Sequence, residues 1–139
     1  MGMTARENFA RQEDIDAILD MRRVAVVGLS SSPWRPSNSV ARSLLSRGYE
    51  ITPVNPNETE VLGRRAYPSL LDLPEPPEVI DVFRRPEFVP GVVDDAIAVG
   101  AKAIWLQLGV IDYQAARRAR EAGLIVVMDR CMAVEVGRR

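Results

Sequence analysis

Short apolar runs alternate along the chain with segments in which apolar residues recur every three or four positions. The first run, residues 24–27, is rich in valine and contains no polar residue, which is typical of a strand buried on both faces. Four more runs predict strands at residues 49–54, 79–83, 102–108 and 124–128. The segments between and around these runs have the spacing of helices, and several end at a glycine.

The helices are expected near residues 13–22, 37–48, 86–100, 112–123 and 132–136. The first of them should have about three turns, since its apolar residues keep helical spacing. Pro86 suits the first turn of the third helix, and Asp112 suits the cap of the fourth. Between residues 58 and 74 we expect short helical turns around a minor strand.

Strands that alternate with helices at this spacing form right-handed βαβ units, in which helices cover both faces of a parallel sheet. The sequence therefore predicts a single α/β domain over residues 1–139, Rossmann-like and doubly wound, with a mostly parallel sheet of five to six strands. Residues 1–12 are expected to be a loosely ordered N-terminal segment. Ligands bind such sheets at the carboxyl ends of the strands, where the strand order reverses. The candidate site therefore lies in the segments after the strands, residues 28–39, 53–57, 83–86, 107–111 and 129–131.

Charge and composition narrow the classes of partner. The formal net charge is −1, whereas proteins that bind nucleic acid or membrane surfaces usually carry a basic excess. No apolar run approaches the ~20 residues needed to cross a bilayer, and the N-terminus lacks the apolar core of a signal peptide. A single cysteine, Cys131, forms no internal disulfide and suits a reducing cytoplasm. We expect a cytoplasmic protein without nucleic-acid or membrane partners; a protein partner, and the choice between monomer and homodimer, stay open.

The sequence contains no histidine. Histidine is the commonest general base and the commonest zinc ligand, so neither a metal site nor a Ser–His or Cys–His catalytic system is expected. We assign no catalytic residue. A binding protein is therefore favoured over an enzyme, although the sequence leaves that choice open.

The loop GLSSSPWRPS follows the first strand, where many α/β proteins bind a dinucleotide. Gly28 fits the first position of the G-x-G-x-x-G fingerprint, but Ser30 and Pro33 occupy the other two. The second strand is followed by Asn55 rather than by an acidic residue for the ribose, so NAD is disfavoured. Serine groups, Arg35 and a helix N-terminus still suit another phosphate. The alternative is a solvated turn that merely caps the helix.

Six blocks along the chain carry a resemblance to a known family: VAVVGLSSSPWRPS, YEITPVNPN, EVLGRRAYPSL, DVFRRPE, GAKAIWLQLGV and VVMDRC. Together they resemble the small stand-alone CoA-binding proteins of bacteria and archaea, a family similar to the N-terminal, CoA-binding domain of the succinyl-CoA synthetase α subunit. The resemblance runs from about Asp14 to Val136. It implies a Rossmann-like domain that binds coenzyme A or an acyl-CoA without further domains.

The resemblance also implies which residues contact the cofactor. The phosphate loop and its continuation would comprise Gly28, Leu29, Ser30, Ser31, Ser32, Pro33, Arg35, Pro36, Ser37 and Asn38. The segment beside the adenosine would comprise Pro53, Val54, Asn55 and Pro56, where the synthetase carries a lysine, which leaves the partner of the 3′-phosphate open. The next strand end would contribute Val82, Phe83 and Arg84. The pantetheine arm would pass Trp105, Gln107 and Gly109.

The chemistry of CoA agrees with these assignments. Its phosphates carry about four negative charges, for which arginines beside backbone donors are suitable partners. Arg35 is the strongest candidate, and Arg84 and the Arg64–Arg65 pair are weaker ones. Cys131 is either a thiol that could pair with that of CoA or a small buried apolar residue.

The synthetase depends on a phosphorylated histidine in a second domain, and this sequence has no histidine. We therefore expect CoA binding without catalysis, for sensing, buffering or delivery of the cofactor. Two alternatives stay open: an enzyme or regulator that binds NAD or another nucleotide in the same cleft, and an interaction module for a ligase-like partner.

Overall fold

The computed structural model describes residues 7–139, and its centre is a five-stranded parallel sheet. The strands are β1 (Arg23–Val27), β2 (Glu50–Val54), β5 (Val79–Val82), β6 (Ala103–Leu106) and β7 (Ile125–Met128), and their order in the sheet is β2-β1-β5-β6-β7. Every neighbouring pair is parallel. The five predicted strands and the doubly wound, Rossmann-like fold class are confirmed.

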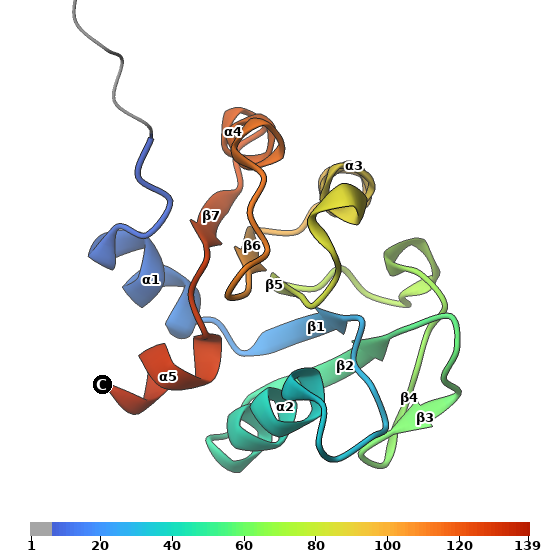
Figure 1. The fold of residues 1–139 in the computed structure, drawn as a ribbon. Coiled ribbons are helices and arrows are strands. Elements are labelled where there is room, and N and C mark those ends of the chain that lie inside the picture. Colours follow the sequence, from blue (N-terminus) through green and yellow to red (C-terminus); the bar gives the residue numbers. More distant parts are fainter. Residues whose placement is uncertain (1–6) are drawn as a thin grey trace, which may run out of the picture.

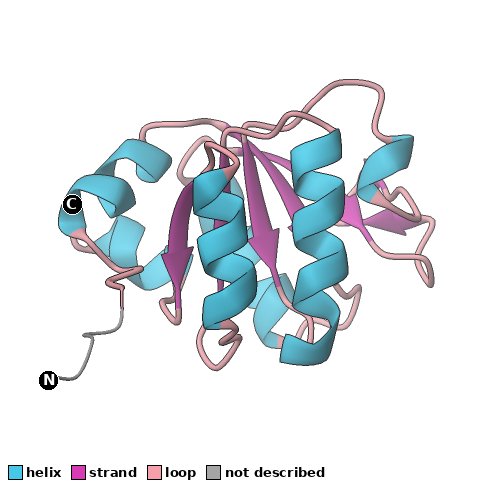
Figure 2. Cartoon of the chain, turned by 90° about the horizontal axis from the view of Figure 1, so that it is seen from above, coloured by secondary structure: helices cyan, strands magenta, loops and turns pink. Residues whose placement is uncertain are grey.

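Helices cover both faces of this sheet (Figure 1). The helices α1 (Gln12–Leu19), α2 (Pro36–Ser46) and α5 (Met132–Gly137) lie on one face, where Leu44 and Trp105 belong to the buried core. The helices α3 (Val89–Ala98) and α4 (Tyr113–Glu121) lie on the other, over a core that includes Ile80 and Ala116. Figure 2 shows α3 and α4 in front of the strands. The first helix has 8 residues, so the expected third turn is absent.

The strand order reverses between β1 and β5. The chain leaves β1 through α2 toward β2, and it leaves β5 through α3 toward β6, so the two loops diverge at the carboxyl ends of neighbouring strands. Gly28 stands at this point with a φ of +87°, and a Cβ added to it would lie 2.4 Å from the carbonyl oxygen of Phe83. Only glycine fits here, because a side chain would clash with backbone and strain the turn. The fold therefore opens a crevice at the place where doubly wound sheets bind ligands.

Residues 58–74 differ from the expectation of short helical turns around a minor strand. They contain an antiparallel hairpin, β3 (Glu60–Val61) and β4 (Arg64–Arg65), followed by the single 3-10 turn η1 (Leu70–Asp72). Leu62 and Gly63 both have positive φ, the backbone of the tight turns that join hairpin strands. A second 3-10 turn, η2 (Pro86–Phe88), opens α3.

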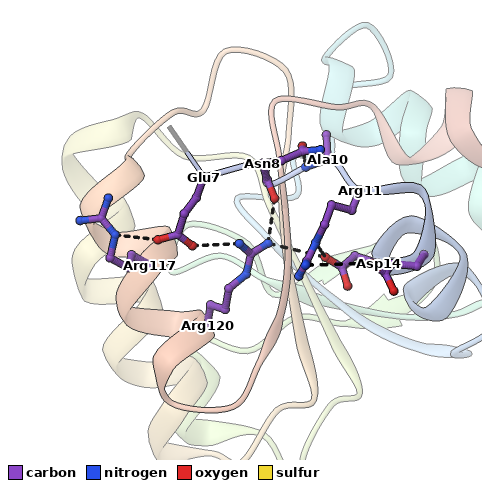
Figure 3. A network of polar contacts seen from close by, with 8 residues as sticks. Glu7, Asn8, Ala10, Arg11, Asp14, Arg117 and Arg120 are labelled. Atoms are coloured by element: carbon purple, nitrogen blue, oxygen red, sulfur yellow. Dashed lines mark hydrogen bonds and ion pairs between the residues drawn. The ribbon is translucent and has the colours of Figure 1, made fainter. Parts of the chain in front are cut away.

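Residues 7–9, at the start of the described part of the chain, contact α4 and β7. Residues 1–6 lie outside the described part of the chain, but Phe9 is only 3% exposed and its carbonyl accepts a hydrogen bond from the Met128 N–H at 2.7 Å. Arg120 contacts the Glu7 carboxylate at 2.9 Å, and Arg117 contacts the same carboxylate at 2.8 Å (Figure 3). The Arg120 guanidinium also lies over the Phe9 ring. One buried aromatic ring and an arginine pair thus hold Glu7 and Phe9 against α4.

Candidate functional site

A cleft of about 830 Å³ lies at the carboxyl edge of the sheet. Loops that follow all five strands contribute to its wall, as the sequence predicted for a doubly wound sheet. Its size falls in the range of small-molecule and cofactor pockets. The cleft is lined by Gly28, Ser30, Ser32, Arg35, Pro36, Ser37, Val40, Asn55, Asn57, Glu58, Phe83, Arg84, Arg85, Pro86, Gln107, Leu108, Gly109, Val110 and Cys131.

The loop between β1 and α2 is held in shape by its own polar groups. The Ser30 N–H donates to the Ser37 hydroxyl at 3.1 Å, and the Ser32 N–H donates to the Ser30 hydroxyl at 3.1 Å. The buried Asn38 amide donates to the Ser30 carbonyl at 2.8 Å. The Ser30 and Ser32 N–H groups, which were expected to meet phosphate, therefore already have acceptors within the protein. Asn38 holds the loop through its buried side chain and does not line the cleft.

The turn after β2 is tied to this loop by Asn55. Its side-chain amide donates to the Leu29 carbonyl at 3.0 Å, and its side-chain oxygen accepts from the Asn57 N–H at 2.9 Å. The resulting turn brings Glu58 against the β1 loop, where the Ser31 N–H donates to the Glu58 carboxylate at 2.7 Å. The sequence interpretation found no acid directly after the second strand. The fold nevertheless supplies one, three residues further along the chain.

Arginine side chains give the cleft a positive wall. Arg35, Arg84 and Arg85 all line it, and within residues 7–139 none of the three forms an ion pair with a carboxylate. The Arg84 guanidinium lies 4.1 Å from the centre of the Phe88 ring, which orients it while leaving its donors available. The Arg64–Arg65 pair instead forms strand β4 and does not line the cleft.

A buried carboxyl group lies beside the cleft wall. Gln107 lines the cleft, and its side-chain amide donates to the Asp81 carboxyl at 2.6 Å. Asp81 is fully buried on β5, and among the described residues its other oxygen has no hydrogen-bond partner. Burial raises the pKa of Asp81 to about 7, although the hydrogen bond from Gln107 acts to lower it.

The structure brings some of the expected CoA contacts to the cleft and leaves others outside it. The residues at the cleft are Gly28, Ser30, Ser32, Arg35, Pro36, Ser37, Asn55, Phe83, Arg84, Gln107 and Gly109. Those outside its lining are Leu29, Ser31, Pro33, Asn38, Pro53, Val54, Pro56, Val82 and Trp105. Trp105 is fully buried and its indole N–H donates to the Arg130 carbonyl at 2.8 Å, so its ring belongs to the core. Contact of any of these residues with a ligand stays a prediction.

Several lining residues were not among the assigned CoA contacts, although Cys131 had been considered for its thiol. They are Val40, Asn57, Glu58, Arg85, Pro86, Leu108, Val110 and Cys131. Most lie in the strand-following segments that the sequence had marked, so their position was available as a signal. Val40 and Glu58 are the exceptions: Val40 lies on α2, and a hydrogen bond from the Ser31 N–H holds the Glu58 side chain against the β1 loop.

Neither a membrane-spanning helix nor a metal-binding cluster occurs in the described residues. None of the helices in residues 7–139 is long and apolar enough to cross a bilayer. Within the same residues no group of three His, Cys, Asp or Glu side chains is placed to hold a metal ion.

Comparisons with known proteins agree with the geometry. A family model described as a CoA binding domain matches residues 22–137. The chain is 38% identical over 128 residues to YneT, an uncharacterized protein of Bacillus subtilis, covering 92% of this chain and 95% of that one. It is 30% identical over 91 residues to the ADP-forming acetate–CoA ligase II of Archaeoglobus fulgidus, covering 64% of this chain but 14% of the ligase. A solved structure of a hypothetical protein from Pyrococcus horikoshii matches with a TM-score of 0.89 and 43% identity, covering 99% of this chain and 98% of that one.

Proposed function

The chain belongs to the CoA binding domain family, and from this membership we propose that its cleft binds coenzyme A or an acyl-CoA. The observation that carries the proposal is that the family match spans the loops after all five strands, and these loops meet around one cleft. The cleft combines the β1 loop, at the N-terminus of α2, with arginines that have no carboxylate partner among the described residues.

The proposal divides the cleft between the two ends of the cofactor. The phosphates would meet the β1 loop and Arg35, because arginine forms charge-assisted hydrogen bonds to phosphate. The pantetheine arm would pass the apolar side chains Leu108 and Val110 toward Cys131, which also line the cleft. Arg84 lies between these regions on the β5 loop and is the second candidate partner for a phosphate.

We propose further that the protein holds the cofactor without transforming it, for sensing, buffering or delivery. The sequence has no histidine, and among residues 7–139 the one carboxylate that lines the cleft, that of Glu58, accepts a hydrogen bond from a backbone N–H. The acetate–CoA ligase relative is far longer, since this chain spans 14% of it, so ligase activity is not transferred to this protein.

A specific observation also favours a second candidate, a nucleotide such as NAD or ADP. Dinucleotide sites hold the ribose hydroxyls with an acidic residue that follows the second strand. Glu58 places a carboxylate at the corresponding edge of this cleft. Ligands with and without the pantetheine arm therefore have to be compared directly.

Calorimetric titration of two arginine variants with CoA tests the proposal. Arg35→Ala should weaken CoA binding by about 1–3 kcal/mol, which is roughly 5- to 150-fold, because a charge-assisted hydrogen bond is lost. Arg64→Ala is the matched control, since Arg64 is exposed and lies outside the cleft. Equal affinities for the two variants would remove Arg35 from the site. No binding of CoA to the unaltered protein would refute the proposed function itself.

A further inference from the structure

The Glu58 carboxylate makes a contact that a phosphate group would make. It accepts a hydrogen bond from the Ser31 N–H at 2.7 Å, on the loop where the proposed function places the CoA phosphates. Carboxylate and phosphate oxygens are both anionic acceptors, and both bind backbone N–H groups strongly. Of the three serine N–H groups in this loop, those of Ser30 and Ser32 donate to neutral hydroxyls, so Ser31 alone has a charged acceptor.

This contact is built by the fold rather than made by a freely moving side chain. Asn55 closes the turn that carries Glu58, because the Glu58 N–H donates to the Asn55 carbonyl at 3.3 Å. The Asn55 amide in turn donates to the Leu29 carbonyl at 3.0 Å, which joins this turn to the β1 loop. Glu58 is half-buried as a result.

Glu58 contacts a backbone N–H although three arginines line the same cleft. Arg35, Arg84 and Arg85 line the same cleft, yet in the described part of the chain Glu58 forms no ion pair with any basic side chain. Its recorded partner is a backbone N–H. A carboxylate that served only to neutralise the arginines would be expected to pair with one of them.

We propose that Glu58 is an internal competitor for the ligand's phosphate. Its carboxylate binds the Ser31 N–H, and an anionic group of the ligand reaches this donor only when Glu58 leaves it. The inference rests on the proposed function, since it assumes that the cleft takes a phosphate-bearing cofactor. It deepens that function by naming a side chain that limits affinity and favours release, as suits a protein that delivers or senses a cofactor.

Affinity measurements on two variants test the competition. Removing a net hydrogen bond to a charged group changes an equilibrium constant by roughly tenfold. Glu58→Ala should therefore bind CoA about tenfold more tightly than the unaltered protein. Glu58→Gln should fall between the two, because its neutral amide oxygen still accepts from the Ser31 N–H but does not repel phosphate. Glu60→Gln is the control for loss of a nearby negative charge, since Glu60 is exposed and outside the cleft.

A second readout follows the donor itself. In NMR spectra of the unaltered protein, the Ser31 amide resonance should move when CoA is added, and Glu58→Ala should move it before any ligand is present. If the unaltered protein binds CoA and Glu58→Ala binds it equally or more weakly, Glu58 is not a competitor; weaker binding would mean that it contacts the ligand. If neither protein binds CoA, the proposed function fails and the inference fails with it.

Discussion

The free energy of unfolding of the unaltered protein should fall between acidic and mildly basic pH, and Asp81→Asn should abolish most of this pH dependence. Asp81 is fully buried in the central strand β5, where its register neighbours are Val26 and Trp105. Its carboxyl accepts one hydrogen bond, from Gln107 at 2.6 Å. Burial in these surroundings raises the pKa of Asp81 to about 7, from an ordinary value of 3.8.

The direction and size of this pH dependence follow from the difference between the Asp81 pKa in the folded protein and its ordinary value. The folded protein keeps the Asp81 proton up to about pH 7, whereas the unfolded chain releases it near pH 4. Between these limits the unfolded state binds fewer protons, so the free energy of unfolding falls as pH rises, by about 1.4 kcal/mol per pH unit. The contribution is fully present below pH 4 and is lost above pH 7, a total of about 4 kcal/mol.

Urea denaturation at pH 5 and at pH 8 measures the effect. Asp81 should lower the free energy of unfolding of the unaltered protein by about 3 kcal/mol between these two values, because about two pH units of its titration range lie between them. Asp81→Asn, a neutral side chain of the same shape, should lack this component and be the more stable protein at pH 8. Glu121→Gln, at an exposed position, should keep the pH dependence of the unaltered protein. Parallel pH profiles for Asp81→Asn and the unaltered protein would refute the raised pKa.

Two further predictions concern the frame of the cleft. Gly28→Ala should destabilise the fold by more than about 2 kcal/mol, because the added Cβ would clash with the Phe83 carbonyl oxygen and the backbone is left-handed there. Gly48→Ala is the control: Gly48 also has a positive φ, +90°, but a Cβ there would have nothing within 4 Å, so this variant should lose only about 1–2 kcal/mol. Similar melting temperatures for the two variants would contradict the clash at Gly28. Phe9→Ala should cost about 3–5 kcal/mol in chemical denaturation, as for other buried aromatic rings, and a loss below 1 kcal/mol would show that the N-terminal segment is not part of the core.

The fold could be predicted from the sequence because its signals are local. Each parallel strand contains a short, mainly apolar run, and helix boundaries are marked by local residues such as the Asp112 cap. The five strands, and the sheet edge that bears the cleft, therefore follow from local sequence. The hairpin at residues 60–65 was missed because its strands have only two residues each, too short to show a period of two.

Contacts between distant segments explain the rest of the differences. Trp105 was placed on the path of the pantetheine arm by the family resemblance, but its side chain is buried in the core between the sheet and its helices. Glu58 reaches the cleft through the Ser31 N–H, 27 residues away in sequence, and no local pattern marks such a pair. Asp81 did leave a signal, since it is the one polar residue inside an apolar strand, and a polar group in that setting points to a special environment.

The central claim is that the cleft binds CoA rather than a nucleotide in general. Isothermal titration of the unaltered protein with CoA, NAD and ADP, at equal ionic strength, tests it most directly. We predict saturable binding of CoA with one site per chain, and weaker binding of NAD and ADP, which lack the pantetheine arm. Equal or tighter binding of NAD, or no heat and no thermal stabilisation with CoA at millimolar concentration, would contradict the account.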